Sequence, residues 1–156
     1  MPLSRSTTRW NTALYAFLGK VVGDAMTRDV KSVSRGLWLR ELGEEFQKRD
    51  FNTFPVVENS HVVGVVSKFD YLACFVFTPA HLIPQYEELM QRSVADIMTL
   101  DFIYVGVDTR LTRVLQLMVD HRIRSLPVIE GDRLPVGMIS REDVMRVLKS
   151  CACGDA

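Results

Sequence analysis

Apolar side chains recur along residues 111–119 with the spacing of one face of an α-helix. They stand at positions i, i+3, i+4, i+7 and i+8, as Leu111, Val114, Leu115, Met118 and Val119. An earlier segment carries the same face at Leu39, Leu42 and Phe46. The spacing predicts an amphipathic helix in both places, and Asp108 or Thr109 is the candidate N-cap of the later one.

Each predicted helix is followed by two short apolar runs with a polar turn between them. The turns are Glu58-Asn59-Ser60 in the first half of the chain and Glu130-Gly131-Asp132 in the second. Short β-branched runs on either side of such turns predict a β-hairpin. A Ser at an N-cap position then opens a further helix, predicted over 68–75 and over 141–149.

The two halves are copies of one sequence pattern. Val22-Gly23-Asp24-Ala25-Met26-Thr27 returns as Val94-Ala95-Asp96-Ile97-Met98-Thr99, a shift of 72 residues (98 − 26). The segment 64–70 returns as 137–143, a shift of 73, so one residue is gained near the hairpin turn. Ordered blocks in one register indicate an internal duplication.

One copy alone would expose an apolar sheet face and two apolar helix faces. We therefore predict that it buries them against its twin around a pseudo-twofold axis, so that the tandem pair is the folding unit. The predicted organisation is an N-terminal amphipathic helix over 1–20, repeat 1 over 21–77, a connecting segment over 78–92, repeat 2 over 93–149 and a flexible tail over 150–156.

Composition narrows the possible partners. The chain has 19 basic and 19 acidic residues and no net charge, which disfavours nucleic-acid binding in spite of the nearby Arg122, Arg124 and Arg133. The apolar stretch 10–18 is interrupted by polar residues and is too short to insert across a membrane. We expect no nucleic acid as partner and no insertion into a membrane.

Candidate catalytic and metal-binding residues do not form a recognisable set. Cys151 and Cys153 have no second pair or nearby His to complete a zinc site, and the three His share no ligand or triad spacing. The chain has only three Cys, namely Cys74, Cys151 and Cys153. Three are too few for a disulfide framework, which predicts free thiols and a cytoplasmic location. We expect no metal, no required cofactor and no enzymatic activity.

The order Asp-x-Met-Thr, helix, Pro-Val and Gly-x-x-Ser-x-x-Asp, occurring twice, resembles the cystathionine-β-synthase (CBS) domain family over about residues 20–149. Ser67-Lys68-Phe69-Asp70 is also similar to a stretch of the γ regulatory subunit of AMP-activated protein kinase. The resemblance implies an α+β fold of two βαββα repeats packed sheet to sheet. It also implies two clefts for adenosine-containing ligands such as AMP, ADP, ATP or S-adenosylmethionine, and an energy-sensing signal to a separate effector protein.

The Ser-x-x-Asp spacing by itself also indicates a possible contact with a ribose. A carboxylate on the first turn of a helix can accept hydrogen bonds from both ribose hydroxyls, while the serine adds one more. Ser67 with Asp70 and Ser140 with Asp143 are the candidate ribose pairs. The alternative is that each pair only caps its helix.

The resemblance makes each site a composite of both repeats. The predicted first cleft contains Ser67, Lys68, Asp70, Thr99, Tyr104, Arg124 and Ser125. The predicted second cleft contains Ser140, Arg141, Asp143, Thr27, Ser32, Asn52 and Thr53. Since Arg124 is replaced by Asn52 in the second, we expect tighter binding of phosphorylated adenosine in the first and regard occupancy of the second as doubtful.

A second function is kept open. The pair could serve as a structural module for homodimerisation or docking, with its clefts filled by bulky side chains such as Tyr104 and Phe54. A homodimer is expected in either case.

Overall fold

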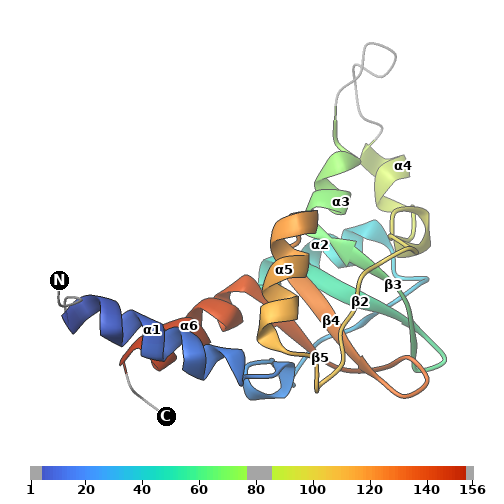
Figure 1. Ribbon diagram of the computed structural model, residues 1–156. Helices are drawn as coiled ribbons and strands as arrows, with labels where there is room; N and C mark the ends of the chain where they lie inside the picture. Colours follow the sequence, from blue (N-terminus) through green and yellow to red (C-terminus); the bar gives the residue numbers. More distant parts are fainter. Residues whose placement is uncertain (1–4, 77–85, 154–156) are drawn as a thin grey trace. The chain divides into compact units, whose positions relative to one another are not determined.

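The computed structural model describes residues 5–76 and 86–153, with side chains from Asn11 onward. Its elements follow the order expected of two copies (Figure 1). They are α1 Arg5–Leu18, the 3₁₀ turn η1 Val22–Asp24, β1 Val33–Ser34, α2 Leu39–Lys48, β2 Thr53–Glu58, β3 His61–Ser67, α3 Lys68–Ala73, α4 Tyr86–Met90, the 3₁₀ turn η2 Val94–Asp96, α5 Leu111–His121, β4 Ser125–Glu130, β5 Leu134–Ser140 and α6 Arg141–Cys153.

These elements fall into two compact units that do not follow the order of the sequence. Unit 1 comprises residues 1–30, 103–130 and 136–156, and unit 2 comprises residues 31–102 and 131–135. The opening segment of the first repeat thus packs with the second hairpin, and η2 packs with the first. Each unit is described by itself below.

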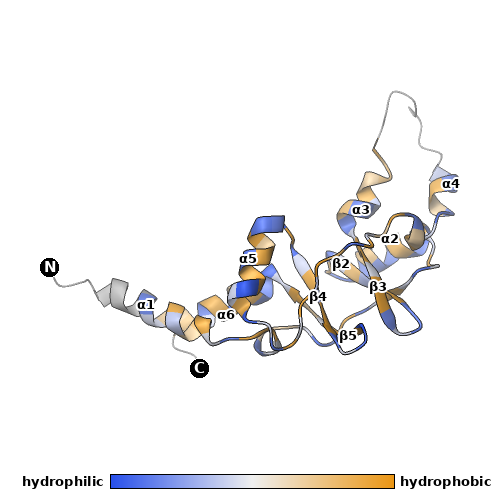
Figure 2. Ribbon diagram, turned by 45° about the vertical axis from the view of Figure 1, so that its right-hand side comes forward, coloured by the Kyte–Doolittle hydropathy of each residue, from blue (hydrophilic) through white to orange (hydrophobic). Residues whose placement is uncertain are grey.

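Unit 2 is built on the three-stranded sheet β1-β2-β3. β1 runs parallel to β2, with Val33 opposite Val56, and β2 pairs with β3 as the predicted antiparallel hairpin. Figure 2 shows hydrophobic residues along β3. The buried core residues of this unit are Val33, Leu39, Leu42, Phe46, Phe54, Val56, Val66, Met90 and Val94.

Aromatic rings fill much of this core. Phe54 is fully buried and its ring stacks on Phe46 with centroids 4.8 Å apart. Tyr71 and Phe75 extend the group from the end of the hairpin toward α4. Phe54 is therefore a core residue of unit 2 that holds α2 on the sheet.

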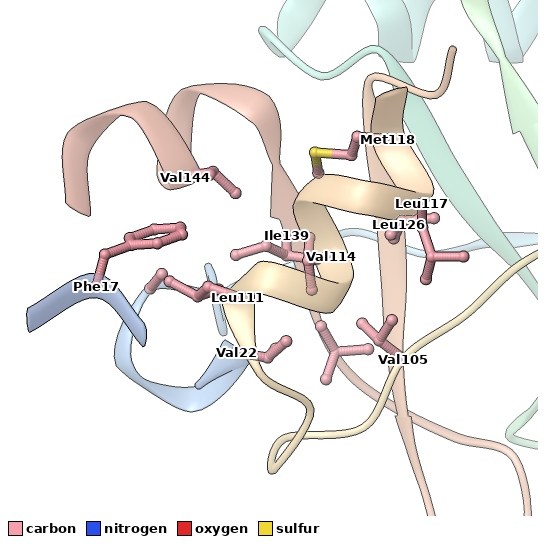
Figure 3. Packing of buried hydrophobic residues seen from close by; sticks show 12 residues of the cluster. Phe17, Val22, Val105, Leu111, Val114, Leu117, Met118, Leu126, Ile139 and Val144 are labelled. Carbon is pink, nitrogen blue, oxygen red and sulfur yellow. The ribbon is translucent and has the colours of Figure 1, made fainter. Parts of the chain in front are cut away.

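Unit 1 contains β4 and β5 from residue 136 onward, together with α1, α5 and α6, while the turn between the two strands belongs to unit 2. A parallel bridge joins Val105 to Val128, as Val33 joins Val56 in unit 2. α1 lies along α6 and contributes the buried ring of Phe17 to the core (Figures 1 and 3). The N-terminal helix is thus part of the packing of this unit.

The buried face of α5 differs from the predicted one. Leu111, Val114 and Met118 are buried as expected, together with Leu117. Leu115 is 38% exposed and Val119 is 67% exposed, although both were expected in the same face. The helix is rotated toward Leu117 because its core face meets β4 and β5, which leaves the other edge of the apolar stripe uncovered.

The C-terminal helix is also longer than predicted. α6 continues to Cys153, so residues 150–153 are helical and the prediction of a flexible tail from 150 is wrong for them. Val147, Leu148 and Cys151 pack against the core of unit 1, which stabilises the added turn. Residues 77–85 of the predicted connection, and 154–156 of the tail, lie outside the described residues.

Two glycines allow backbone segments to approach the hairpins closely. Thr27 exchanges hydrogen bonds with Met138 (2.8 and 2.9 Å), and Thr99 exchanges them with Val65 (2.8 and 3.0 Å). A Cβ on Gly137 would lie 2.5 Å from the Thr27 carbonyl oxygen. The corresponding distance for Gly64 is 2.9 Å to the Thr99 carbonyl. Glycine is required here because the neighbouring atoms belong to the backbone.

Gly137→Ala should lower the free energy of unfolding by about 1–3 kcal/mol, the usual effect of overpacking a dense interior. Gly36→Ala is the matched control, since nothing lies within 4 Å of a Cβ at Gly36. Urea unfolding followed by circular dichroism measures both. Equal stability of the two variants would contradict the close approach.

Candidate functional site

The first Ser-Asp pair opens α3 in unit 2. The Ser67 hydroxyl oxygen accepts the backbone N–H of Asp70 at 3.1 Å. In return Asp70 Oδ2 accepts the backbone N–H of Ser67 at 2.8 Å and its hydroxyl at 2.9 Å. This reciprocal capping explains why the helix begins at Lys68 and fixes the carboxylate on its first turn.

The second oxygen of this carboxylate is available. Asp70 Oδ1 has no hydrogen-bond or ion-pair partner among the described residues, and no buried side-chain oxygen or nitrogen of these residues lacks one. Asp70 thus presents a held, half-buried carboxylate with an acceptor oxygen that no described residue uses.

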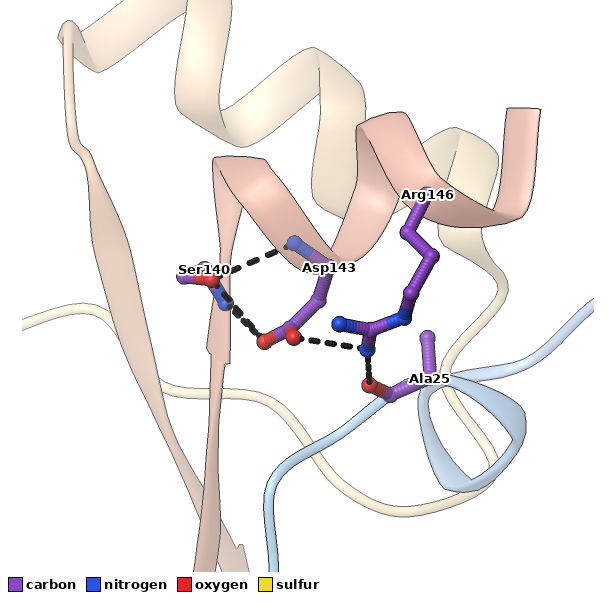
Figure 4. A network of polar contacts seen from close by, with 4 residues as sticks. All are labelled: Ala25, Ser140, Asp143 and Arg146. Atoms are coloured by element: carbon purple, nitrogen blue, oxygen red, sulfur yellow. Dashed lines mark hydrogen bonds and ion pairs between the residues drawn. The ribbon is translucent and has the colours of Figure 1, made fainter. Parts of the chain in front are cut away.

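The second Ser-Asp pair opens α6 in unit 1 with the same capping geometry. Asp143 Oδ2 accepts the Ser140 N–H and hydroxyl, both at 2.9 Å. Here the other oxygen is occupied, because Oδ1 forms an ion pair with Arg146 at 2.8 Å (Figure 4). Asp143 is only 5% exposed. The two pairs therefore have the same capping geometry, but they differ at Oδ1 of the carboxylate, which is bonded to Arg146 only in Asp143.

Arg146 was not among the predicted site residues. Its guanidinium also donates to the Ala25 carbonyl oxygen at 3.1 Å, so it joins α6 to the segment that leads to Thr27 (Figure 4). The signal in the sequence is its position three residues after Asp143, where the first copy has Ala73. Side chains at this spacing share one helix face.

Each unit brings a predicted threonine beside its Ser-Asp pair. In unit 2 Thr99 is bonded to Val65, two residues before Ser67, and in unit 1 Thr27 is bonded to Met138, two residues before Ser140. We call Ser67, Asp70 and Thr99 the first half-site. Ser140, Asp143 and Thr27 form the second half-site.

The other predicted residues are divided between the units. In unit 2 the Lys68 N–H donates to the Asn52 carbonyl at 2.9 Å, Thr53 lies opposite Ser67, and Ser32 is half-buried. In unit 1 the Arg141 N–H donates to the Arg124 carbonyl at 3.0 Å. Ser125 is buried and Tyr104 is 49% exposed.

Asn52 and Thr53, and likewise Arg124 and Ser125, thus lie beside the Ser-Asp pair of their own repeat. Their grouping with the pair of the other repeat stays a prediction.

A model of a known protein family matches the chain twice, once over each of the two repeats that contribute to the half-sites. The model of the CBS domain matches residues 22–76 and again residues 94–150. The chain belongs to the CBS domain family. This confirms the resemblance found in the sequence and the mixed α+β fold of two CBS repeats.

Relatives of this CBS protein are mostly longer. An uncharacterized protein of Methanocaldococcus jannaschii, MJ1232, is 24% identical over 127 residues, which are 81% of this chain and 39% of that protein. The mitochondrial CBS domain-containing protein CBSX3 of Arabidopsis thaliana is 36% identical over 93 residues, 58% of this chain and 41% of its own. The chain therefore spans less than half the length of these relatives.

Solved CBS structures share the fold. CBSX2, a CBS-pair protein of Arabidopsis thaliana solved in complex with AMP, is 27% identical, with a TM-score of 0.73 and coverage of 85% of this chain and 98% of CBSX2. MJ1225 of Methanocaldococcus jannaschii is 23% identical, with a TM-score of 0.77 and coverage of 88% and 52%. The CBS pair of MJ0100, solved with 5′-methylthioadenosine and S-adenosyl-L-methionine, is 20% identical, with a TM-score of 0.69 and coverage of 84% and 97%.

Unit 1 of this CBS protein also contains a pocket that the sequence analysis did not predict. Its volume is about 430 Å³ and it lies between α5 and α6. Aliphatic side chains form most of its wall, and three arginines complete it. The lining residues are Leu115, Met118, Val119, Arg122, Ile123, Arg124, Arg141, Val144, Met145 and Leu148.

The equivalent space in unit 2 is filled. Gly43 stands at the position of Leu115 and Tyr71 at that of Val144. A Cβ on Gly43 would lie 2.5 Å from the Tyr71 hydroxyl oxygen, so the tyrosine occupies this space. The sequence signal for the difference is that Gly43 and Tyr71 of the first copy are replaced by Leu115 and Val144 in the second.

The described residues contain no cluster of His, Cys, Asp and Glu able to hold a metal ion, and none of their helices has the length and apolarity to cross a bilayer. The thiols are free. Cys74 lies behind the first half-site, with its sulfur 3.5 Å from the Asp70 carbonyl oxygen. Burial raises the pKa of the Cys74 thiol, Arg92 partly offsets this, and the Asp70 carboxylate raises it further.

We expect iodoacetamide to modify the exposed Cys153 before Cys74. A raised pKa leaves less of the reactive thiolate at neutral pH, so Cys74 alkylation should accelerate as the pH rises toward that pKa. Mass spectrometry of timed samples between pH 7 and pH 9 measures both rates. If Cys74 were alkylated faster than Cys153 at pH 7, this would contradict the burial of Cys74.

Proposed function

We propose that this CBS pair binds an adenosine-containing ligand of the AMP, ADP or ATP type and reports its occupancy to a separate effector protein. The first half-site holds the ribose. The observation that supports this proposal is the Asp70 carboxylate, fixed by Ser67 through Oδ2 and unpaired at Oδ1 among the described residues.

The chemistry of the carboxylate suits a ribose. Its two oxygens offer about four acceptor positions. Asp70 uses two of them for Ser67, which leaves two for the neighbouring 2′- and 3′-hydroxyls of a nucleoside. Hydrogen bonds to an ionised acceptor are stronger than those between neutral groups, so the diol gains affinity from this arrangement.

The choice of nucleotide is supported by CBSX2, which was solved with AMP and is similar to this chain over 85% of its length. S-adenosylmethionine is the alternative ligand, because the ribose of that compound offers the same diol. The predicted phosphate contact from Arg124 is what favours AMP, ADP or ATP within this proposal.

The proposed role is regulatory. A ligand that binds one conformation more tightly than another shifts the population toward it, and a partner can recognise the shifted state. Homoserine O-acetyltransferase of Methanohalobium evestigatum is 26% identical to 89% of this chain, yet the match covers only 26% of that enzyme. Because most of that enzyme lies outside the match, we propose that this chain binds a ligand and does not catalyse a reaction. We further propose that the role is energy sensing and that the protein acts in the cytoplasm.

Asp70→Asn should weaken AMP binding at least tenfold, since the amide has lost both the charge and one acceptor. Asp143→Asn is the matched control and should leave the affinity of the tighter site nearly unchanged. Isothermal titration calorimetry measures both. Loss of binding in Asp143→Asn with retention in Asp70→Asn would assign the ligand to the second half-site.

A second candidate function is self-association through the pocket between α5 and α6. Val119 and Met145 at this pocket are 67% and 65% exposed, and exposed apolar surface of this kind favours a protein contact. Next to them, Glu142 forms an ion pair with the pocket residue Arg141 at 3.0 Å, so the apolar surface has a polar rim, as protein interfaces do. We propose that a second copy of the chain covers this pocket through an isologous contact.

Val119→Glu should convert the dimer to a monomer, because a carboxylate would then be buried in an apolar contact. The control is Leu100→Glu, which changes a residue that is 65% exposed and does not line the pocket. Sedimentation velocity over a concentration series measures the association. Unaltered sedimentation of Val119→Glu would exclude this surface.

A further inference from the structure

The two half-sites differ at one position that bears directly on the carboxylate. Three residues after each Asp, the first repeat has Ala73 and the second has Arg146. The Ser, the Asp and the Thr are the same in both, and so is the capping geometry. The effect of this single difference can therefore be followed from the contacts of one side chain.

Arg146 uses an acceptor that a ribose would need. Asp143 already accepts two hydrogen bonds from Ser140, and the guanidinium takes a third position at Oδ1. Of about four acceptor positions on a carboxylate, one is then left for a diol that brings two donors. Among the described residues no group takes the corresponding positions on Asp70, because Ala73 cannot donate, and two are left.

A second contact holds Arg146 in place. The nitrogen that meets Asp143 also donates to the Ala25 carbonyl, two residues before Thr27. Arg146 thus bridges α6 and the segment that supplies the threonine of the same half-site. A ligand that displaced the guanidinium would break both contacts at once.

We infer that Arg146 is the residue that closes the second half-site to a ribose, so that the chain binds one nucleotide at the first half-site. This inference rests on the proposed function. Arg146 acts through its occupation of Asp143, and is in this sense a specificity-determining residue of the pair.

The block is partial. The Arg146 side chain is 65% exposed, so water can hydrate the guanidinium after it has been displaced. Exposed ion pairs are weak, but this one meets a buried carboxylate and is charge-assisted. We expect it to weaken ribose binding about tenfold, in line with hydrogen bonds to charged groups.

A reciprocal exchange tests the inference with AMP as the probe and calorimetry as the measurement. The wild type should bind one AMP per chain. Arg146→Ala should tighten binding at the second half-site about tenfold and bring the stoichiometry toward two. Ala73→Arg should place a guanidinium three residues after Asp70 and weaken the first site by a similar factor.

Two further variants separate the charge contact from general effects of size. Arg146→Lys keeps a cation three residues after Asp143 and should keep the second half-site weak. Ala73→Met adds a long side chain without a charge at an exposed position and should leave the first site unchanged.

The outcomes are distinct. If the wild type binds AMP, and Arg146→Ala binds it with the same affinity and stoichiometry, the inference is overturned and the proposed function stands. If Arg146→Ala does not fold, Ala73→Arg decides, and equal affinity of Ala73→Arg and Ala73→Met overturns the inference. If neither the wild type nor Arg146→Ala binds AMP, the proposed function and the inference both fail.

Discussion

The close backbone approach at two glycines is the constraint on which both half-sites depend. Thr27 lies against Gly137, and Thr99 against Gly64, at distances that leave no room for a side chain. In each case the threonine segment is bonded to the strand that ends at the capping serine. The approach therefore sets the threonine and the Ser-Asp pair into one fixed group.

The same constraint explains why the compact units cross the boundaries of the repeats. Thr27 belongs to the first repeat in the sequence but packs with the hairpin of the second, and Thr99 packs with the hairpin of the first. Neither repeat contains a complete half-site of its own. The duplication that is visible in the sequence is thus a requirement for the group of side chains that we propose to bind a ligand.

Much of this arrangement could be predicted from the sequence, because the relevant signals are local. The shift of 72 or 73 residues holds for α2 and α5, for both hairpins and for the helices that follow them. Ser67 and Ser140 cap their helices as their spacing to the Asp predicted. The features that the sequence did not predict depend on contacts between residues that lie far apart in the chain. The rotation of α5 follows from its contact with the sheet, and the bond from Arg146 to Ala25 joins residues 121 positions apart.

The filled space under Tyr71 has a consequence for how the two repeats could diverge. Gly43 and Tyr71 fit each other closely, so the side chains of α2 and α3 can change only in concert. The open counterpart between α5 and α6 carries no such coupling at its exposed residues Val119 and Met145, where a single substitution alters only a surface. The first copy therefore tolerates only paired changes at Gly43 and Tyr71, whereas the second tolerates independent changes at its exposed pocket residues.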